Sequence, residues 1–148
     1  MFQGEFKNDQ SQGEGCLFTA ASKTVYTGPF EQDLPHGRGK EEYDDGSVYI
    51  GEFVRGVMAG NCKFIFADGG IYQGMMVNGK ALGKGKYIYK NTNKVYEGEY
   101  KDNLKHGRGV LTTQDYTYEG EFSMGAMQGL GEFRWKNGKK AKGNLVNG

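Results

Sequence analysis

The pattern of aromatic, glycine and polar positions repeats along this chain every 22 to 24 residues. Tyr96-Glu97-Gly98-Glu99-Tyr100 shows the recurring unit, in which two aromatic residues and a glycine alternate with polar residues. Copies begin at Phe2, Tyr26, Tyr49, Tyr72, Tyr96 and Tyr118, and a partial copy begins at Ala141. A fixed period of about 20–50 residues indicates stacked supersecondary units. The chain is therefore predicted to be a repeat array.

Glycine occupies fixed positions when each copy is numbered from its first residue. Positions 3 and 12 hold glycine in every complete copy, and position 14 holds glycine except at Cys62. Position 8 carries residue types that tolerate positive φ in tight turns. These residues are Asp9, Asp33, Gly56, Gly79, Asn103, Gly125 and Gly148. Each copy is therefore predicted to form two short strands joined by a hairpin turn.

The alternation predicts which side chains share a face of the sheet. Positions 1, 3 and 5 point to one side and positions 2 and 4 to the other, because side chains alternate along a strand. The returning strand continues the ring face at positions 16 and 18, with Tyr43, Phe64, Phe66, Tyr87, Tyr89, Phe133 and Trp135. These ring positions hold 18 of the 20 aromatic residues, so the rings must cover the glycines and one another. We predict an all-β, single-layered solenoid of stacked β-hairpins, an elongated rod formed by residues 1–148 as one continuous array.

Two copies carry a further motif. Leu34-Pro35-His36-Gly37-Arg38-Gly39 is followed by Asp45-Gly46-Ser47, and Lys105-His106-Gly107-Arg108-Gly109 occupies the same place in a later copy. With the aromatic-glycine unit, these residues resemble the MORN repeat over nearly the whole chain. The resemblance implies a scaffold like the near-pure MORN proteins of protist and ciliary cytoskeletons, some of which self-associate through their repeats. MORN arrays are also linked to phosphoinositides and occur as modules of lipid kinases and lysine methyltransferases.

The ends of the sequence and its hydropathy set further expectations. The chain enters its first copy at once and stops within its seventh, whereas terminal repeats of solenoids usually carry atypical capping sequence. We therefore expect a segment of a longer array. No apolar run approaches the roughly 18–20 residues of a membrane span, and no signal-peptide pattern is visible. We expect a cytoplasmic location, on the cytoskeleton or in association with a membrane.

The charge of the chain is unevenly distributed. Residues 1–70 hold 6 Lys and Arg against 11 Asp and Glu, whereas residues 71–148 hold 13 against 7. This asymmetry favours a homodimer in which the acidic end of one copy meets the basic end of another. The alternative is that these charges are only solvated. Because Ala141 replaces an aromatic residue, the last copy should pack poorly by itself, and the predicted dimer contact is Phe133, Trp135 and Leu145.

The ring face is the predicted binding surface for a cytoskeletal or membrane-associated protein. A curved face lined by aromatic residues suits an extended peptide or a helix. The predicted partner-binding residues are Tyr49, Phe64, Tyr72, Tyr87, Tyr96, Tyr100 and Tyr118. The alternative is that these rings are structural.

Two other functions remain as alternatives. The basic half could tether an anionic phospholipid surface at about 1 kcal/mol per basic residue. The residues concerned are Lys84, Lys86, Lys136, Lys139, Lys140 and Lys142. Against this, the lysines are spread over both faces and no amphipathic helix is present. A regulatory module of a larger enzyme is the third possibility. Nucleic-acid binding is not expected, because the sheet uses the aromatic residues and the net charge is near zero.

Catalytic and metal-binding motifs are absent from the sequence. The Gly-x-Gly pairs do not extend to either phosphate-binding glycine motif, and the glutamates at positions 2 and 4 recur along an exposed face. We therefore expect no enzyme activity and no cofactor. Cys16 and Cys62 lie two copies apart, beyond disulfide reach, so we predict free thiols. His36 and His106 lie three copies apart, so these histidines and the two cysteines cannot form a zinc site within one chain. Zinc bridging between two chains is the alternative that remains.

Overall fold

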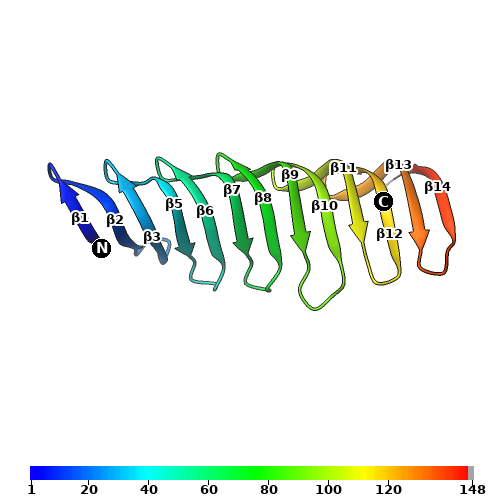
Figure 1. Ribbon diagram of the computed structural model, residues 1–148, viewed down its shortest axis with the longest axis horizontal. Helices are drawn as coiled ribbons and strands as arrows, with labels where there is room; N and C mark the ends of the chain where they lie inside the picture. The colour runs from blue at the N-terminus through cyan, green and yellow to red at the C-terminus, as the bar shows by residue number, and fades with distance from the viewer. Residues whose placement is uncertain (147–148) are drawn as a thin grey trace.

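The computed structural model describes residues 1–146, which form one open antiparallel sheet of 14 strands and no helix. The strands are β1 (Phe2–Lys7), β2 (Gln10–Thr19), β3 (Thr24–Glu31), β4 (Leu34–Pro35), β5 (Gly37–Glu42), β6 (Val48–Val54), β7 (Val57–Ile65), β8 (Ile71–Val77), β9 (Lys80–Ile88), β10 (Val95–Lys101), β11 (Leu104–Thr112), β12 (Tyr116–Ser123), β13 (Ala126–Trp135) and β14 (Lys140–Leu145). The strands follow one another in chain order, except that β4 pairs only with β3. Figure 1 shows them side by side across the long axis of the molecule. The predicted all-β solenoid of stacked hairpins is confirmed.

Each hairpin turn has the backbone geometry that the sequence indicated. Both central residues have positive φ, for example 49° at Asn78 and 74° at Gly79, or 49° at Asp102 and 69° at Asn103. Positive φ at both positions is typical of the type I′ turn, whose twist matches that of the flanking strands. All six position-8 residues from Asp9 to Gly125 have positive φ. Gly148 lies outside the described residues.

A bulge within the hairpins bends the sheet, which the sequence pattern did not predict. Gly98 pairs with Gly109, but Tyr100 pairs with Lys105, so the returning strand contains two additional residues there. Residues four apart on a straight strand lie about 13 Å apart. The ring centroids of Tyr96 and Tyr100 are nevertheless only 5.3 Å apart. Each hairpin is therefore folded toward its ring face, and the stacked hairpins form a trough.

The tyrosine at position 1 holds the core together. Tyr26 packs edge-to-face on Phe30 of its own copy at 5.1 Å and on Phe53 of the next copy at 4.9 Å. Its hydroxyl donates a hydrogen bond to the carbonyl oxygen of Pro29 at 2.9 Å. Tyr49, Tyr72, Tyr96 and Tyr118 likewise donate to the carbonyl of the residue three positions later. Such edge-to-face pairs each contribute about 0.5–1.5 kcal/mol beyond their buried area, so the zipper of rings links neighbouring repeats.

The glycines of positions 3 and 14 form the floor beneath these rings. A Cβ built on Gly109 would lie 2.6 Å from the hydroxyl oxygen of Tyr96, and a Cβ on Gly98 would meet the Cα of Gly109. Glycine is therefore required for the close approach of ring and backbone.

Among the described residues, no helix is present that could span a membrane.

Candidate functional site: the aromatic trough

Five of the seven predicted partner-binding residues belong to the core. The exposed fraction of Tyr49, Tyr96 and Tyr118 is 0%, that of Tyr72 is 3% and that of Tyr100 is 7%. Other rings pack on each of them, from the same copy around Tyr49 and Tyr118 and also from the next copy around Tyr96. In this structure they offer no surface to a partner, which corrects their assignment as contact residues.

The other two predicted residues, Phe64 and Tyr87, remain partly accessible. They belong to a continuous row, here called the aromatic ladder, formed by Tyr43, Phe64, Phe66, Tyr87 and Tyr89. The successive ring centroids are separated by 5.8, 4.6, 5.6 and 4.6 Å. Phe66 is 37% exposed, and the other four rings are half-buried. The sequence pattern placed Tyr43, Phe66 and Tyr89 at position 18 of the ring face, but they were not among the predicted partner-binding residues.

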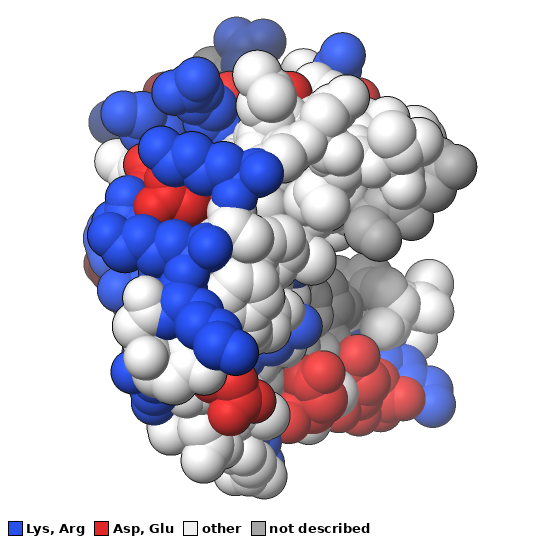
Figure 2. Space-filling model, turned by 90° about the vertical axis from the view of Figure 1, so that its right-hand side faces the viewer, with Lys and Arg blue, Asp and Glu red and all other residues white. Residues whose placement is uncertain are grey.

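The ladder faces the second wall of the trough, which the turn-side ends of the hairpins form. The Tyr43 hydroxyl lies 3.7 Å from the sulfur of Met58 on β7. The ammonium of Lys105 on β11 donates to the hydroxyl of Tyr89. Figure 2, viewed along the rod, shows the molecule hollowed on one side, with most of the lysine and arginine side chains visible in this view on the other.

The two ends of the ladder differ in charge. At one end the Tyr43 hydroxyl donates to the Glu41 carboxylate at 2.9 Å, and burial together with this carboxylate raises the pKa of Tyr43. At the other end the ammonium groups of Lys94 and Lys105 lie 4.6 and 5.1 Å from the centroid of the Tyr89 ring. Cation–π contacts of this kind contribute about 0.5–1 kcal/mol at exposed sites. The trough therefore combines apolar rings with tyrosine hydroxyls and two cations, a surface suited to binding.

The predicted dimer-contact residues lie on the last two strands. The rings of Phe133 and Trp135 stack at 5.4 Å, and Phe133 also packs at 4.9 Å on Tyr118. Trp135 is 36% exposed, while Leu145 on β14 is half-buried opposite Gly129. The structure thus brings Phe133 and Trp135 together. Leu145 lies on β14, four residues beyond Ala141, the residue that pairs with Phe133.

The absence of a ring at position 1 of the last copy leaves its floor uncovered. A Cβ built on Gly143 would meet no atom within 4 Å, whereas the Cβ positions of Gly120 and Gly131 meet the Tyr118 ring. The reason is that Ala141 cannot extend over the neighbouring glycine. The sheet at β14 is therefore less well packed than at β12.

The predicted lipid-binding lysines lie on or near the outer face of the sheet. Lys84, Lys86 and Lys142 line a broad open groove of ≈ 1040 Å³ over the glycine rows, on the side away from the rings. Lys86 is 3.8 Å from Glu97, and Lys142 is 2.8 Å from Glu132. Two of these three charges are therefore offset by carboxylates of the same groove.

The remaining lysines of this group cluster near the turn between β13 and β14. Lys136, Lys139 and Lys140 are all exposed. Close by, Lys142 and Arg134 hydrogen-bond to Glu132 and lower the pKa of that carboxylate to about 2. The basic surface is thus interrupted by one strongly ionised acid.

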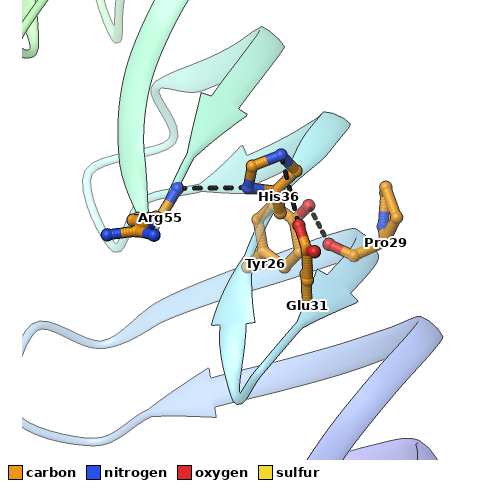
Figure 3. A network of polar contacts seen from close by, with 5 residues as sticks. All are labelled: Tyr26, Pro29, Glu31, His36 and Arg55. Atoms are coloured by element: carbon orange, nitrogen blue, oxygen red, sulfur yellow. Dashed lines mark hydrogen bonds and ion pairs between the residues drawn. The ribbon is translucent and has the colours of Figure 1, made fainter.

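His36 connects neighbouring hairpins, as Figure 3 shows. Its Nε2 lies 3.4 Å from the Glu31 carboxylate, and its Nδ1 accepts a hydrogen bond from the backbone N–H of Arg55 at 3.4 Å. Because Arg55 begins the next hairpin turn, the imidazole links two copies. This is a structural role for the histidine of the His-Gly-x-Gly motif.

The cysteines and metal-binding residue types remain dispersed. Cys16 and Cys62 are free thiols, and burial raises the pKa of Cys62 to about 11. Within residues 1–146, no group of three or more His, Cys, Asp or Glu side chains is placed to hold a metal ion. Zinc bridging between two chains stays an alternative.

Comparisons with known proteins place the chain in a family. The model of the MORN repeat matches residues 2–19, 26–48, 49–71, 72–94, 96–117 and 118–140. A search among curated proteins finds no match. One similar solved structure is from work on the G-box domain of the microcephaly protein CPAP, with a TM-score of 0.44 and 10% identity over 90% of this chain and 75% of that chain. Because its six matched repeats span most of the sequence, the chain belongs to the MORN-repeat family.

Proposed function

We propose that this chain is a scaffold that captures an extended segment of a cytoskeletal or membrane-associated protein along the aromatic ladder and that pairs with a second copy of itself. MORN repeats are consistent with a non-enzymatic repeat scaffold. The observation that carries the proposal is the ladder, a continuous row of partly exposed rings beside the buried tyrosines of position 1. The buried tyrosines stabilise the array, which leaves positions 16 and 18 free for contacts.

The shape and chemistry of the trough support an extended protein segment as the ligand. The ladder runs through three successive repeats, from Tyr43 at the end of one to Tyr89 at the end of another. Partially exposed aromatic residues are enriched at protein interfaces because each supplies much contact area at little entropic cost. Hydroxyls at both ends, on Tyr43 and Tyr89, add polar groups that can fix the register of a bound chain.

Capture is tested by site-specific photo-crosslinking. A benzophenone amino acid introduced at Phe66 should crosslink a partner in cells, because this ring is the most exposed of the ladder. The same amino acid at Glu97, on the outer face, is the matched control. Crosslinks at Glu97 but not at Phe66 would contradict the proposed site.

Self-association is supported by the unequal charge of the two halves and by the weakly packed last strand. Light scattering with in-line chromatography should give about twice the monomer mass of 16.4 kDa. If charge drives pairing, the dimer should weaken as the Debye length falls from about 10 Å at 0.1 M salt to about 3 Å at 1 M. Replacing Phe133 and Trp135 by serine should yield a folded monomer. A monomer of the wild-type chain at both salt concentrations would contradict pairing.

Tethering to anionic phospholipid is the alternative function, and one observation favours it. The outer face gathers lysine and arginine side chains away from the hollow of the trough (Figure 2). Sedimentation with phosphatidylserine vesicles tests this alternative. Replacing Lys136, Lys139 and Lys140 by glutamine should then reduce binding, whereas Phe66→Ser should not affect it.

A further inference from the structure

The trough contains a small cavity at the basic end of the ladder. It has a volume of ≈ 300 Å³ and lies between Tyr87 and Tyr89 on one wall and Leu104 and Lys105 on the other, with Tyr100 also lining it. This volume is at the lower end of the roughly 300–1,000 Å³ of ligand pockets. The cavity is therefore large enough for one side chain of a bound segment.

Lys105 departs from the repeat pattern at this cavity. The equivalent position 10 in the other copies holds Ser11, Pro35, Met58, Ala81 and Met127. Lys105 is half-buried and, within residues 1–146, forms no ion pair. Its ammonium instead donates to the Tyr89 hydroxyl and lies 5.1 Å from the ring centroids of both Tyr89 and Tyr96. The positive charge of Lys105 is therefore only partly compensated, because aromatic rings and a neutral hydroxyl stabilise a partly desolvated ammonium less than a carboxylate would.

Tyr100 departs from the pattern at the same place, and this second observation is independent of the first. The equivalent position 5 holds Phe6, Phe30, Phe53, Met76 and Phe122 in the other copies. A phenylalanine would therefore provide the packing, and the hydroxyl is additional. That hydroxyl is buried and has no hydrogen-bond partner in the described part of the chain. A buried polar group left unpaired costs about 1–3 kcal/mol, so its presence calls for an explanation.

We propose that this cavity is a subsite for the carboxylate of an acidic side chain, carried by an extended protein segment that lies along the aromatic ladder. The inference rests on the proposed capture function and specifies its ligand. The lining residues include a cation and no acid, so the cavity complements an anion. The half-buried Lys94, also without an ion pair within residues 1–146, adds a second ammonium 4.6 Å from the Tyr89 ring centroid.

The carboxylate would accept hydrogen bonds from Lys105 and from the Tyr89 hydroxyl that Lys105 now contacts. Tyr100 lines the same cavity, and its unpaired hydroxyl would donate to the bound carboxylate once the lining side chains adjust to the ligand. A protein segment is favoured over a lipid headgroup, because the cavity lies within the trough, on the side of the sheet away from the outer basic face. Apolar side chains next to the acidic residue would pack on Phe66 and Tyr87.

The test is an array of random nonapeptides synthesised as matched pairs, with glutamate or glutamine at the central position. The wild-type chain should retain glutamate peptides about tenfold or more over their glutamine twins, because hydrogen bonds to a charged group are strong. Lys105→Met should abolish this preference. Methionine is the residue that two other copies carry at this position, at Met58 and Met127, so the variant should fold. Lys63→Met is the control and should keep the preference, because Lys63 pairs with Gln73 of the outer face and belongs to no proposed site.

Tyr100→Phe gives a second readout that a merely structural role would not produce. Its preference for glutamate should fall while its stability stays equal or rises, since only an unpaired hydroxyl is removed. Equal retention of glutamate and glutamine peptides by the wild type, or an unchanged preference in Lys105→Met, would overturn the subsite and leave the capture function standing. Retention of no peptide at all would overturn both. Loss of binding to phosphatidylserine vesicles in Lys105→Met would assign Lys105 to the lipid and also overturn the subsite.

Discussion

Adding one methyl group to Gly74 should weaken the array through the ring above it. A Cβ at this position would lie 2.8 Å from the Cα of Gly85 and 2.8 Å from Cζ of Tyr72. The backbone of the paired strand has little room to move, so the Tyr72 ring must lift. Lifting it stretches the hydrogen bond to the carbonyl of Met75, now 3.0 Å long, and the edge-to-face contact with Tyr100 at 5.1 Å.

The magnitude follows from these contacts. Overpacking costs typically about 1–3 kcal/mol, a lost hydrogen bond about 1 kcal/mol, and a lost aromatic pair about 0.5–1.5 kcal/mol. Because these terms overlap, we expect Gly74→Ala to lower the free energy of unfolding by about 2–4 kcal/mol. For a chain of this size, that corresponds to a melting temperature lower by about 5–15 °C. Gly74→Val should cost more, since its branched side chain cannot avoid the ring.

Gly143→Ala provides the matched control, because it occupies the same position of the repeat. A Cβ there meets no atom within 4 Å. Alanine also reduces the entropy of the unfolded chain, which stabilises by about 0.4–1 kcal/mol where the backbone tolerates it. Urea titrations followed by far-ultraviolet circular dichroism should therefore show opposite changes in the two variants. Equal unfolding of Gly74→Ala and the wild type would refute the claim that the ring requires a bare glycine floor.

Three further predictions concern individual hydroxyl, carboxyl and thiol groups. Tyr96→Phe should lower the free energy of unfolding by about 0.5–1.5 kcal/mol because it removes a buried hydrogen bond, whereas Tyr100→Phe should not; equal losses in denaturant titrations would contradict this. The pKa of Glu132 is about 2 in the folded chain, below its ordinary 4.5. Its contribution to stability should therefore be complete above about pH 4.5 and lost as the pH falls toward 2. An NMR titration that gives Glu132 a pKa near 4.5 in the folded chain would contradict this. Because burial raises the pKa of Cys62 to about 11, iodoacetamide at neutral pH should modify the half-buried Cys16 first, and mass spectrometry of the peptides would reveal the reverse order.

The tyrosines of position 1 lie on the face that alternation predicts, but their burial depends on the tertiary structure. Side-chain alternation along the strands correctly placed Tyr49 and Tyr118 on the ring face. It does not distinguish a ring that is exposed to a partner from a ring that is buried in the core. Burial depends on the bend at the bulge, where Tyr118 and Phe122 are brought to 5.4 Å. The bulge arises from two additional residues on the returning strand, and their position becomes evident only from the pairing register.

The repeat sequence by itself determined the all-β class, the hairpin turns and the two faces of each strand, because these depend on residues close together in the chain. Turn residues set φ locally, and side-chain alternation is a property of any strand. Only the tertiary structure decided which rings are buried and which form the ladder. It also brought Tyr89, Tyr100 and Lys105 to one cavity. These residues lie on strands or loops that meet only when hairpins bend and stack, so their contacts depend on the shape of the sheet as well as on the pattern of residues.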